Sequence, residues 1–150
     1  MSDYSVVGHS VHRRDAAMKV TGQVLHVGNI RMPGLLHVAV LRSTYPHARI
    51  ARIDKSKAEA LPGVTAVVTG ADIAAMPGVD PYYGPAFRDQ PILAIDRVLH
   101  VGDPVVAVAA EDRRKAEDAL QLAEIDYEPL PPILDVLEAV KSDAPLVHEK

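Results

Sequence analysis

The 150-residue chain contains no cysteine and no tryptophan, and it has only one phenylalanine. The absence of cysteine excludes disulfides, thiolate catalysis, zinc–cysteine sites and cysteine-ligated iron–sulfur clusters within this chain. We therefore expect any redox centre to come from elsewhere. Because aromatic residues are so few, the core is expected to be built from aliphatic side chains.

The sequence also lacks a cluster of basic residues, a long apolar run and a phosphate-binding glycine motif. A net charge of −4 without a Lys/Arg cluster argues against a nucleic-acid partner. No apolar run approaches the ~20 residues that cross a bilayer, and residues 1–5 show no signal pattern, so we expect a cytoplasmic protein without a membrane partner. Neither the dinucleotide-binding nor the P-loop glycine motif occurs, which leaves no evident cradle of backbone N–H groups for a phosphate.

A chain of 150 residues is by default one domain, here spanning residues 1–150, and it is long enough to bury a core. Residues 1–20 show weak periodicity, and we interpret them as an N-terminal arm that lies on another surface. Within the arm, Asp15–Lys19 is expected to make a helical turn that ends at Thr21-Gly22.

The strongest pattern lies in residues 98–132, around the unbroken apolar run Val105–Ala110. Such a run predicts a strand that is buried on both faces, as parallel strands are. A helix is predicted next, because apolar residues recur at helical spacing: Ala116, Ala119, Leu120 and Ala123. Ile125 and Tyr127 then alternate with acidic residues, which predicts a half-exposed strand. This region is therefore predicted to be a strand–helix–strand unit with parallel strands.

A second strand–helix–strand unit is predicted for residues 48–69. Its first strand ends at Asp54, whose carboxylate is placed to cap a helix over Lys55–Leu61. Pro62-Gly63 ends that helix, and Val64–Thr69 forms the second strand. The two units together indicate an α/β (α+β) fold with a mixed sheet.

Three weaker elements complete the prediction. Val24–Val27 has the pattern of a short strand, and Leu35–Leu41 is an almost wholly apolar strand. Residues 133–140 carry an apolar stripe that predicts a final helix.

Residues 76–91 form a long loop that is rich in proline and glycine. Loops longer than ~12–15 residues in compact domains are usually functional or disordered, and the aromatic residues of this loop argue against disorder. Tyr82, Tyr83 and Phe87 are therefore candidates for a partner interface, where aromatic side chains are favoured. Packing of the loop onto its own domain is an equally good interpretation.

The histidines do not predict a metal site. His9 and His12 have a spacing compatible with a metal, but they lie in the unpatterned arm, where Asp15 is the nearest carboxylate. The histidines inside the predicted strands are interpreted as structural, and they are His26, His37 and His100.

Other polar residues predict no catalytic and no cofactor-binding site. Ser43, His47 and Asp54 suggest a triad, but no strained nucleophile turn surrounds Ser43, so a turn-forming serine is the better interpretation. The acidic residues 124, 126 and 128 alternate along one strand. They predict a solvated or partner-facing edge rather than an acid–base pair.

Seven phrases of the sequence, in a fixed order, resemble one protein family. They are Asp15-Ala-Ala-Met-Lys-Val-Thr-Gly22, Pro33-Gly-Leu-Leu-His37, Leu41-Arg-Ser43 with His47-Ala-Arg-Ile50, Leu61-Pro-Gly-Val64 with Thr69-Gly-Ala-Asp72, Val101-Gly-Asp-Pro-Val105, Asp126-Tyr-Glu-Pro-Leu-Pro131 and Ala144-Pro-Leu-Val-His148. The chain resembles the N-terminal a/b hammerhead domain of the molybdopterin-binding large subunit of molybdenum hydroxylases. That family includes xanthine dehydrogenases, aldehyde oxidases and oxidoreductases, aerobic CO dehydrogenases and nicotinate-type dehydrogenases. One departure is Asn29, where the family usually has Asp.

The resemblance implies an a/b hammerhead fold within a larger oxidoreductase that hydroxylates a heterocycle or an aldehyde with oxygen from water. The complete enzyme is expected to carry molybdenum–molybdopterin, 2Fe-2S and FAD, none of them bound by this chain. Its partners are then a molybdopterin-binding catalytic portion, an iron–sulfur subunit and a flavin subunit. The catalytic domains lie downstream in the family and are expected to be absent here, so that the chain alone is inactive and prone to self-associate. The alternative is a free-standing interaction module that has lost its catalytic partner.

Overall fold

The computed structural model of the protein describes residues 4–148. The chain divides into two compact units, Met1–Leu35 and Leu36–Lys150. In the first unit, helix α1 (Ala16–Val20) is the expected helical turn, and Thr21 ends it. None of the described residues of this unit is buried, so the unit has no core of its own.

The strand predicted for Val24–Val27 is wrong. A 3-10 turn, η1 (Val27–Asn29), begins there, and no strand pairs with this segment among the described residues. A strand without a partner leaves its backbone N–H and C=O groups unpaired. A short apolar segment is therefore not stable as a strand unless another strand pairs with it.

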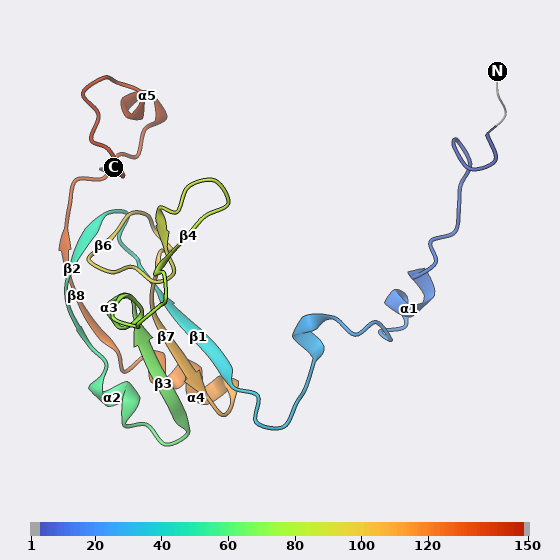
Figure 1. The fold of residues 1–150 in the computed structure, drawn as a ribbon, viewed down its shortest axis with the longest axis horizontal. Coiled ribbons are helices and arrows are strands. Elements are labelled where there is room, and N and C mark those ends of the chain that lie inside the picture. Colours follow the sequence, from blue (N-terminus) through green and yellow to red (C-terminus); the bar gives the residue numbers. More distant parts are fainter. Residues whose placement is uncertain (1–3, 149–150) are drawn as a thin grey trace. The chain divides into compact units, whose positions relative to one another are not determined.

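The described part of the second unit contains three small sheets (Figure 1). Sheet A has the strand order β1-β7-β3, formed by His37–Arg42, Pro104–Ala110 and Val64–Thr69. Sheet B has the order β6-β2-β8, formed by Arg97–Val98, Ala48–Asp54 and Glu124–Pro129. The third is a short hairpin of β4 (Tyr82–Tyr83) and β5 (Gln90–Pro91). The helices are α2 (Ser56–Glu59), α3 (Gly70–Ala74), α4 (Arg113–Leu120) and α5 (Val136–Ala139).

The α/β (α+β) class and both strand–helix–strand units are confirmed, but the parallel pairing within one mixed sheet is wrong. Every strand pair among the described residues is antiparallel. Each unit instead begins in one sheet and ends in the other, β2–α2–β3 passing from B to A and β7–α4–β8 from A to B. Only residues 55–63 join β2 to β3, which is shorter than the dozen or more residues that a parallel crossover needs.

The core lies between the two sheets and is aliphatic, as composition predicts. β7 is the central strand of sheet A, and Val105, Val106 and Val108 on it are fully buried. Ala48 of sheet B and Val67 of β3 belong to the same buried cluster. Burial of β7 on both faces, however, is incomplete, because its alternate alanines are only half-buried.

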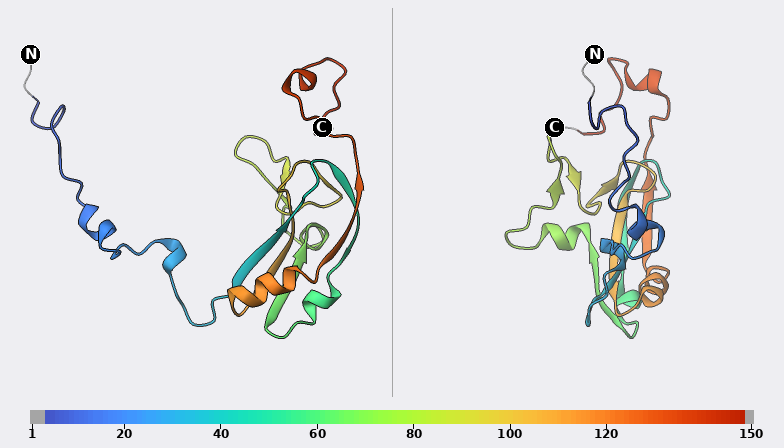
Figure 2. Two further views of the ribbon diagram at one scale, coloured as in Figure 1. Left: turned by 180° about the vertical axis from the view of Figure 1, so that it is seen from behind. Right: turned by 90° about the vertical axis from the view of Figure 1, so that its right-hand side faces the viewer.

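Helix α4, which the apolar stripe predicts, covers one face of sheet A. It lies against β1 and β7, and Figure 2 shows it beside the strands. Its buried residues are Ala116, Ala119 and Leu120, three of the four residues of the predicted stripe. The Asp112 side chain accepts the Lys115 backbone N–H at 2.8 Å and begins the helix. The side-chain stripe and the cap thus agree with helical spacing and with a carboxylate N-cap.

The two shorter predicted helices are present but reduced to about one turn. Asp54 Oδ1 accepts the Ser56 backbone N–H at 3.1 Å, as expected for this carboxylate, but the N-cap position is Lys55, which makes no side-chain cap hydrogen bond. Helix α2 ends at Glu59. In the predicted helix 133–140, only Val136–Ala139 is helical, and its apolar side chains are exposed. Without a surface to bury its stripe, a helix of this length gains little stability.

None of the helices between residues 4 and 148 has the length and apolar character needed to span a membrane.

Candidate functional site

The loop predicted over residues 76–91 is partly a hairpin, and its aromatic residues point outward. Tyr82 and Tyr83 form β4, which pairs with β5. Phe87, in the connection between them, is 77% exposed, and both tyrosines are exposed as well. Their role as a partner interface stays a prediction, because exposure shows an available surface and not what covers it.

The turn that joins β4 to β5 leaves no room for a side chain at its first residue, Gly84. At Gly84 the backbone has φ +157°, and a Cβ atom there would lie 1.6 Å from the Phe87 carbonyl oxygen. Only glycine therefore fits at this position. On the other side of the hairpin, Asp80 accepts the Tyr82 backbone N–H at 3.0 Å and pairs with Arg88 at 2.7 Å. These contacts hold the aromatic side chains in place without burying them.

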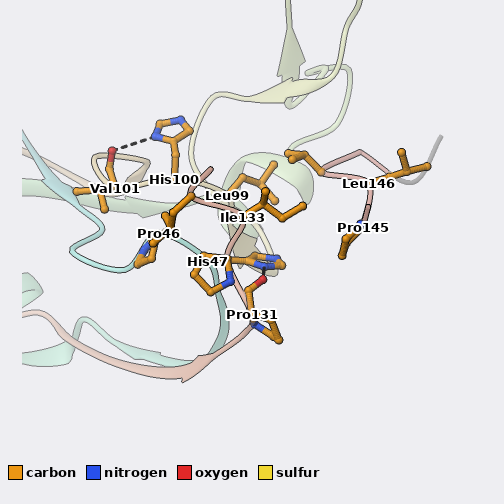
Figure 3. Close-up of a pocket in the computed structure, with 12 residues that line it drawn as sticks. Pro46, His47, Leu99, His100, Val101, Pro131, Ile133, Pro145 and Leu146 are labelled. Carbon is orange, nitrogen blue, oxygen red and sulfur yellow. Dashed lines mark hydrogen bonds between the residues drawn. The ribbon is translucent and has the colours of Figure 1, made fainter. Parts of the chain in front are cut away.

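An apolar groove lies beside the hairpin (Figure 3). It encloses about 230 Å³ and is lined by the turn before β2, the segment Leu99–Val101, residues 131–134 and residues 145–147. The His47 carbonyl accepts the Leu130 N–H at 2.9 Å, and His47 Nδ1 lies 2.9 Å from the Pro131 carbonyl oxygen. These two hydrogen bonds fix the segment that follows β8 against the turn before β2.

The groove continues toward the aromatic hairpin. A second hollow of about 460 Å³ is lined by Tyr82 and Arg88 and shares Leu99 and Val147 with the groove. The sequence interpretation missed this surface, although the prolines around position 131 and the apolar Leu146-Val147 were visible in it. Both hollows bring together segments that are far apart in the sequence, so periodicity could not reveal them.

The structure does not assemble the triad suggested by Ser43, His47 and Asp54. Ser43 is buried, and its hydroxyl accepts a hydrogen bond from the Tyr45 N–H and donates one to the Tyr45 carbonyl oxygen, both at 3.0 Å. It therefore has the predicted turn-forming role. Asp54 lies at the end of β2 and His47 just before its beginning, a separation of roughly 20 Å at the rise of a strand.

The other buried polar side chains are also engaged within the fold. Asp103 accepts the Leu99 N–H at 2.7 Å and lies 3.2 Å from His100 Nε2. Thr69 and Asp72 form a reciprocal capping box at the beginning of α3. Within residues 4–148, no buried side-chain nitrogen or oxygen lacks a hydrogen-bond partner.

Asp72 also pairs with Lys55 at 2.7 Å, which ties α2 to α3. Burial raises the pKa of the Asp72 carboxyl, but the hydrogen bonds from Lys55 and Thr69 outweigh it, so the net pKa lies below its ordinary value. The hydrogen bond to Asp72 conversely raises the pKa of the Lys55 ammonium. A carboxylate with three donors that belong to the fold is a structural group rather than a proton donor at neutral pH.

The acidic edge predicted on β8 is an exposed row of ion pairs with basic residues of β2 and α2. The pairs are Arg49–Glu128, Arg52–Asp126 and Lys57–Glu124. Two acids of the row are therefore neutralised from the neighbouring strand β2, and Glu124 is neutralised from α2. A solvated edge agrees with this arrangement, and exposed ion pairs of this kind contribute little to stability.

The described residues do not form a holder for a metal–pterin group. No group of three or more His, Asp or Glu side chains that could hold a metal occurs within residues 4–148. The buried side-chain nitrogen and oxygen atoms of the same region all have hydrogen-bond partners, and no phosphate-binding glycine motif is present. We therefore derive no chemical step from these residues. What the fold offers is a set of uncovered apolar surfaces.

Comparison with known proteins gives one consistent result. Residues 21–131 match the family model for the a/b hammerhead domain of aldehyde oxidase and xanthine dehydrogenase. The chain is 43% identical over 130 residues to the carbon monoxide dehydrogenase large chain of Afipia carboxidovorans, a match of 85% of this chain and 16% of that protein. It is 37% identical over 146 residues to the nicotinate dehydrogenase large molybdopterin subunit of Eubacterium barkeri, covering 97% of this chain and 33% of that subunit.

The fold agrees with these sequence matches. The structure superimposes on CO dehydrogenase from Oligotropha carboxidovorans with a TM-score of 0.83 and 41% identity, over 93% of this chain and 17% of that chain. In each comparison the chain spans a third or less of the length of the protein that it matches.

Proposed function

The chain belongs to the a/b hammerhead domain family of aldehyde oxidases and xanthine dehydrogenases. We propose that it is the non-catalytic N-terminal domain of the large subunit of a molybdenum hydroxylase, or a separately encoded subunit of such an enzyme. The match to the large molybdopterin subunit of another dehydrogenase over 97% of this chain supports this role most directly. The complete enzyme hydroxylates a heterocycle or an aldehyde, with water as the source of oxygen.

In this proposal the chain contributes folding and docking surfaces. The molybdenum–molybdopterin group, which supplies oxygen transfer when bound, is held by a catalytic portion outside residues 4–148. Iron–sulfur (2Fe-2S) and FAD domains or subunits carry the electrons away. The aromatic hairpin with Tyr82, Tyr83 and Phe87, together with the groove beside it, docks on the catalytic portion. Support comes from the exposure of these side chains.

The test is purification of the tagged protein from the cells that encode it, under mild conditions. Molybdenum, iron and flavin should be recovered with the wild-type chain in a constant ratio. The same tag on a chain with Tyr83→Ser and Phe87→Ser should recover less molybdenum, because the hairpin loses two of its three aromatic contacts. A wild-type preparation with none of the three cofactors would refute the proposal and leave the free-standing interaction module.

The isolated 150-residue chain should be colourless and inactive. We expect no molybdenum in metal analysis and no dye-linked turnover of xanthine, aldehydes or nicotinate above a buffer control. The native complex, assayed in parallel with the same dyes, is the positive control. Stoichiometric molybdenum in the isolated chain would overturn the assignment of a non-catalytic role.

A further inference from the structure

The outer face of sheet A is apolar across all its strands. The residue partners in the sheet place Val40 beside Ala107 and Val68, and Val38 beside Ala109 and Ala66. The alternate residues of the same strands face the core, where Val106, Val108 and Val67 are buried. Because successive side chains point to opposite faces, the first set must share the outer face. All of its members are valine or alanine, and none of them is buried.

Sheet B of the same molecule shows what a solvent-facing sheet looks like. Its outward row carries the ion pairs of Arg49, Arg52 and their acidic partners on β8. Antiparallel sheets with one wet face normally show this alternation of apolar and polar residues. Sheet A departs from it, so its outer face has the composition of an interior and not of a wet surface.

Part of this face is covered by the chain itself. The Ala94 N–H donates to the Pro104 carbonyl at 2.7 Å, and Gly70 lies directly against the Ala94 backbone. This contact protects the end of sheet A where β7 begins. No other described element of the second unit covers the opposite end, where Val38 is 65% exposed and Ala66 is also exposed.

The size of the open face decides what occupies it. Three strands ~4.8 Å apart and about four residues of length give roughly 200 Å². A specific interface between separate proteins buries about 800 Å² per partner, so neither a second copy nor a free protein is held by this face alone. A strip ~14 Å wide is instead filled by one helix, whose diameter is about 10–12 Å. A helix held nearby by a tether or a larger interface needs no large area of its own.

From these observations we infer that the outer face of sheet A receives an apolar helix of the molybdopterin-binding portion of the large subunit. The relatives supply the missing length, because more than four fifths of the CO dehydrogenase large chain lies outside the segment that matches this chain. Alanines on the face let the helix backbone approach closely, and the valines at its edge pack along the helix sides. This inference rests on the proposed function.

Two substitutions on the face test it, with a matched control on the other sheet. Val38→Lys and Ala66→Lys each place a charge on the open face of sheet A. Ala51→Lys is the control, because Ala51 is an exposed alanine of β2 in the charged sheet B. Each protein is purified with its complex from the cells that encode it, and molybdenum per tagged chain is measured. Circular dichroism and thermal melting verify that each variant is folded.

Val38→Lys and Ala66→Lys should lower the bound molybdenum about tenfold or more, since a charge buried against a helix costs at least that factor in affinity. Ala51→Lys should stay within about twofold of the wild type. Equal recovery from all variants would overturn the inference while the proposed function stands. A wild type without molybdenum would overturn both. A dimer of the 150-residue chain that Val38→Lys dissociates, seen by analytical ultracentrifugation, would assign the face to a second copy instead.

Discussion

Val106→Asp is the sharpest test of how this fold is held together. Val106 has no exposed surface, it lies on the central strand of sheet A, and its side chain faces the core. Its neighbours across the sheet are Leu41 on β1 and Thr69 on β3. The buried residues of the core cluster are aliphatic, Tyr127 is among the residues packed against it, and none of these residues carries a basic group. An aspartate at this position therefore meets no charge partner.

The expected cost follows from two terms. Removing a buried valine forfeits about 1.5–3 kcal/mol of burial free energy. An uncompensated charge in a core costs about 3–5 kcal/mol more. The sum of roughly 5–8 kcal/mol is comparable to the whole free energy of unfolding of a typical domain, which is about 5–15 kcal/mol. We expect Val106→Asp to be unfolded or insoluble at neutral pH.

A graded series separates the charge from the loss of volume. Val106→Ala removes two methyl groups and should lower the free energy of unfolding by roughly 2 kcal/mol while the chain still folds. Val38→Asp, on the open face of the same sheet, is the control and should cost no more than about 1 kcal/mol, because Val38 is 65% exposed. Urea titration followed by circular dichroism measures all of these variants.

The pH dependence of Val106→Asp has a fixed sign. Burial raises the folded-state pKa of the introduced carboxyl above its unfolded value near 3.9. The variant should therefore be least stable above the raised pKa and recover part of the loss as the pH falls and the group becomes neutral. A soluble Val106→Asp chain that melts cooperatively at pH 7 with nearly wild-type stability would refute the buried position of β7.

The remaining predictions concern the capping box and the aromatic hairpin. Asp72→Asn should lower the free energy of unfolding at pH 7 by about 0.5–2 kcal/mol, since it weakens the cap of α3 and the pair with Lys55. Because the pKa of Asp72 is lowered in the fold, its contribution is present above the unfolded pKa near 3.9 and is lost as the pH falls further. Thermal melts of both proteins between pH 7 and pH 3 should therefore converge at acid pH, and a constant difference would contradict this account. In the isolated chain, amides in residues 84–89 should exchange hydrogen rapidly, because the aromatic hairpin lacks its partner. Strong protection there, measured by mass spectrometry, would show that the hairpin packs on its own domain.

Much of the fold is visible in local patterns. The stripe of Ala116, Ala119 and Leu120 predicts α4 because helical spacing puts these residues on one face, and the structure buries all of them. Val64–Thr69 is a strand with the bounds that its flanking turn indicates. The Asp54 carboxylate accepts the Ser56 backbone N–H in the first turn of α2, although the N-cap position itself is Lys55. Each of these features depends on neighbours within a few residues.

The candidate site was only partly visible. The aromatic residues of the loop stand out by composition, and they are exposed in the structure. The groove beside them was not visible, because its walls come from residues near 46, 100, 132 and 146. Nor did the sequence show that the acids of β8 have basic partners on β2. Strand pairing is a long-range choice, so the partner of a strand residue cannot be identified from its own neighbourhood.

The sequence by itself determined the aliphatic core, the elements with strong periodicity and, through its ordered phrases, the family. It determined that both faces of Val105–Ala110 are apolar, but not what covers them. Tertiary structure decided that the neighbours of β7 run antiparallel and that each strand–helix–strand unit links two sheets. It also decided that the second face of sheet A is covered only in part, near the beginning of β7. The physical reason is that the hydrophobic effect is non-directional, so any apolar contact stabilises an apolar side chain. A run of valine and alanine therefore does not indicate whether its own chain or another segment buries it.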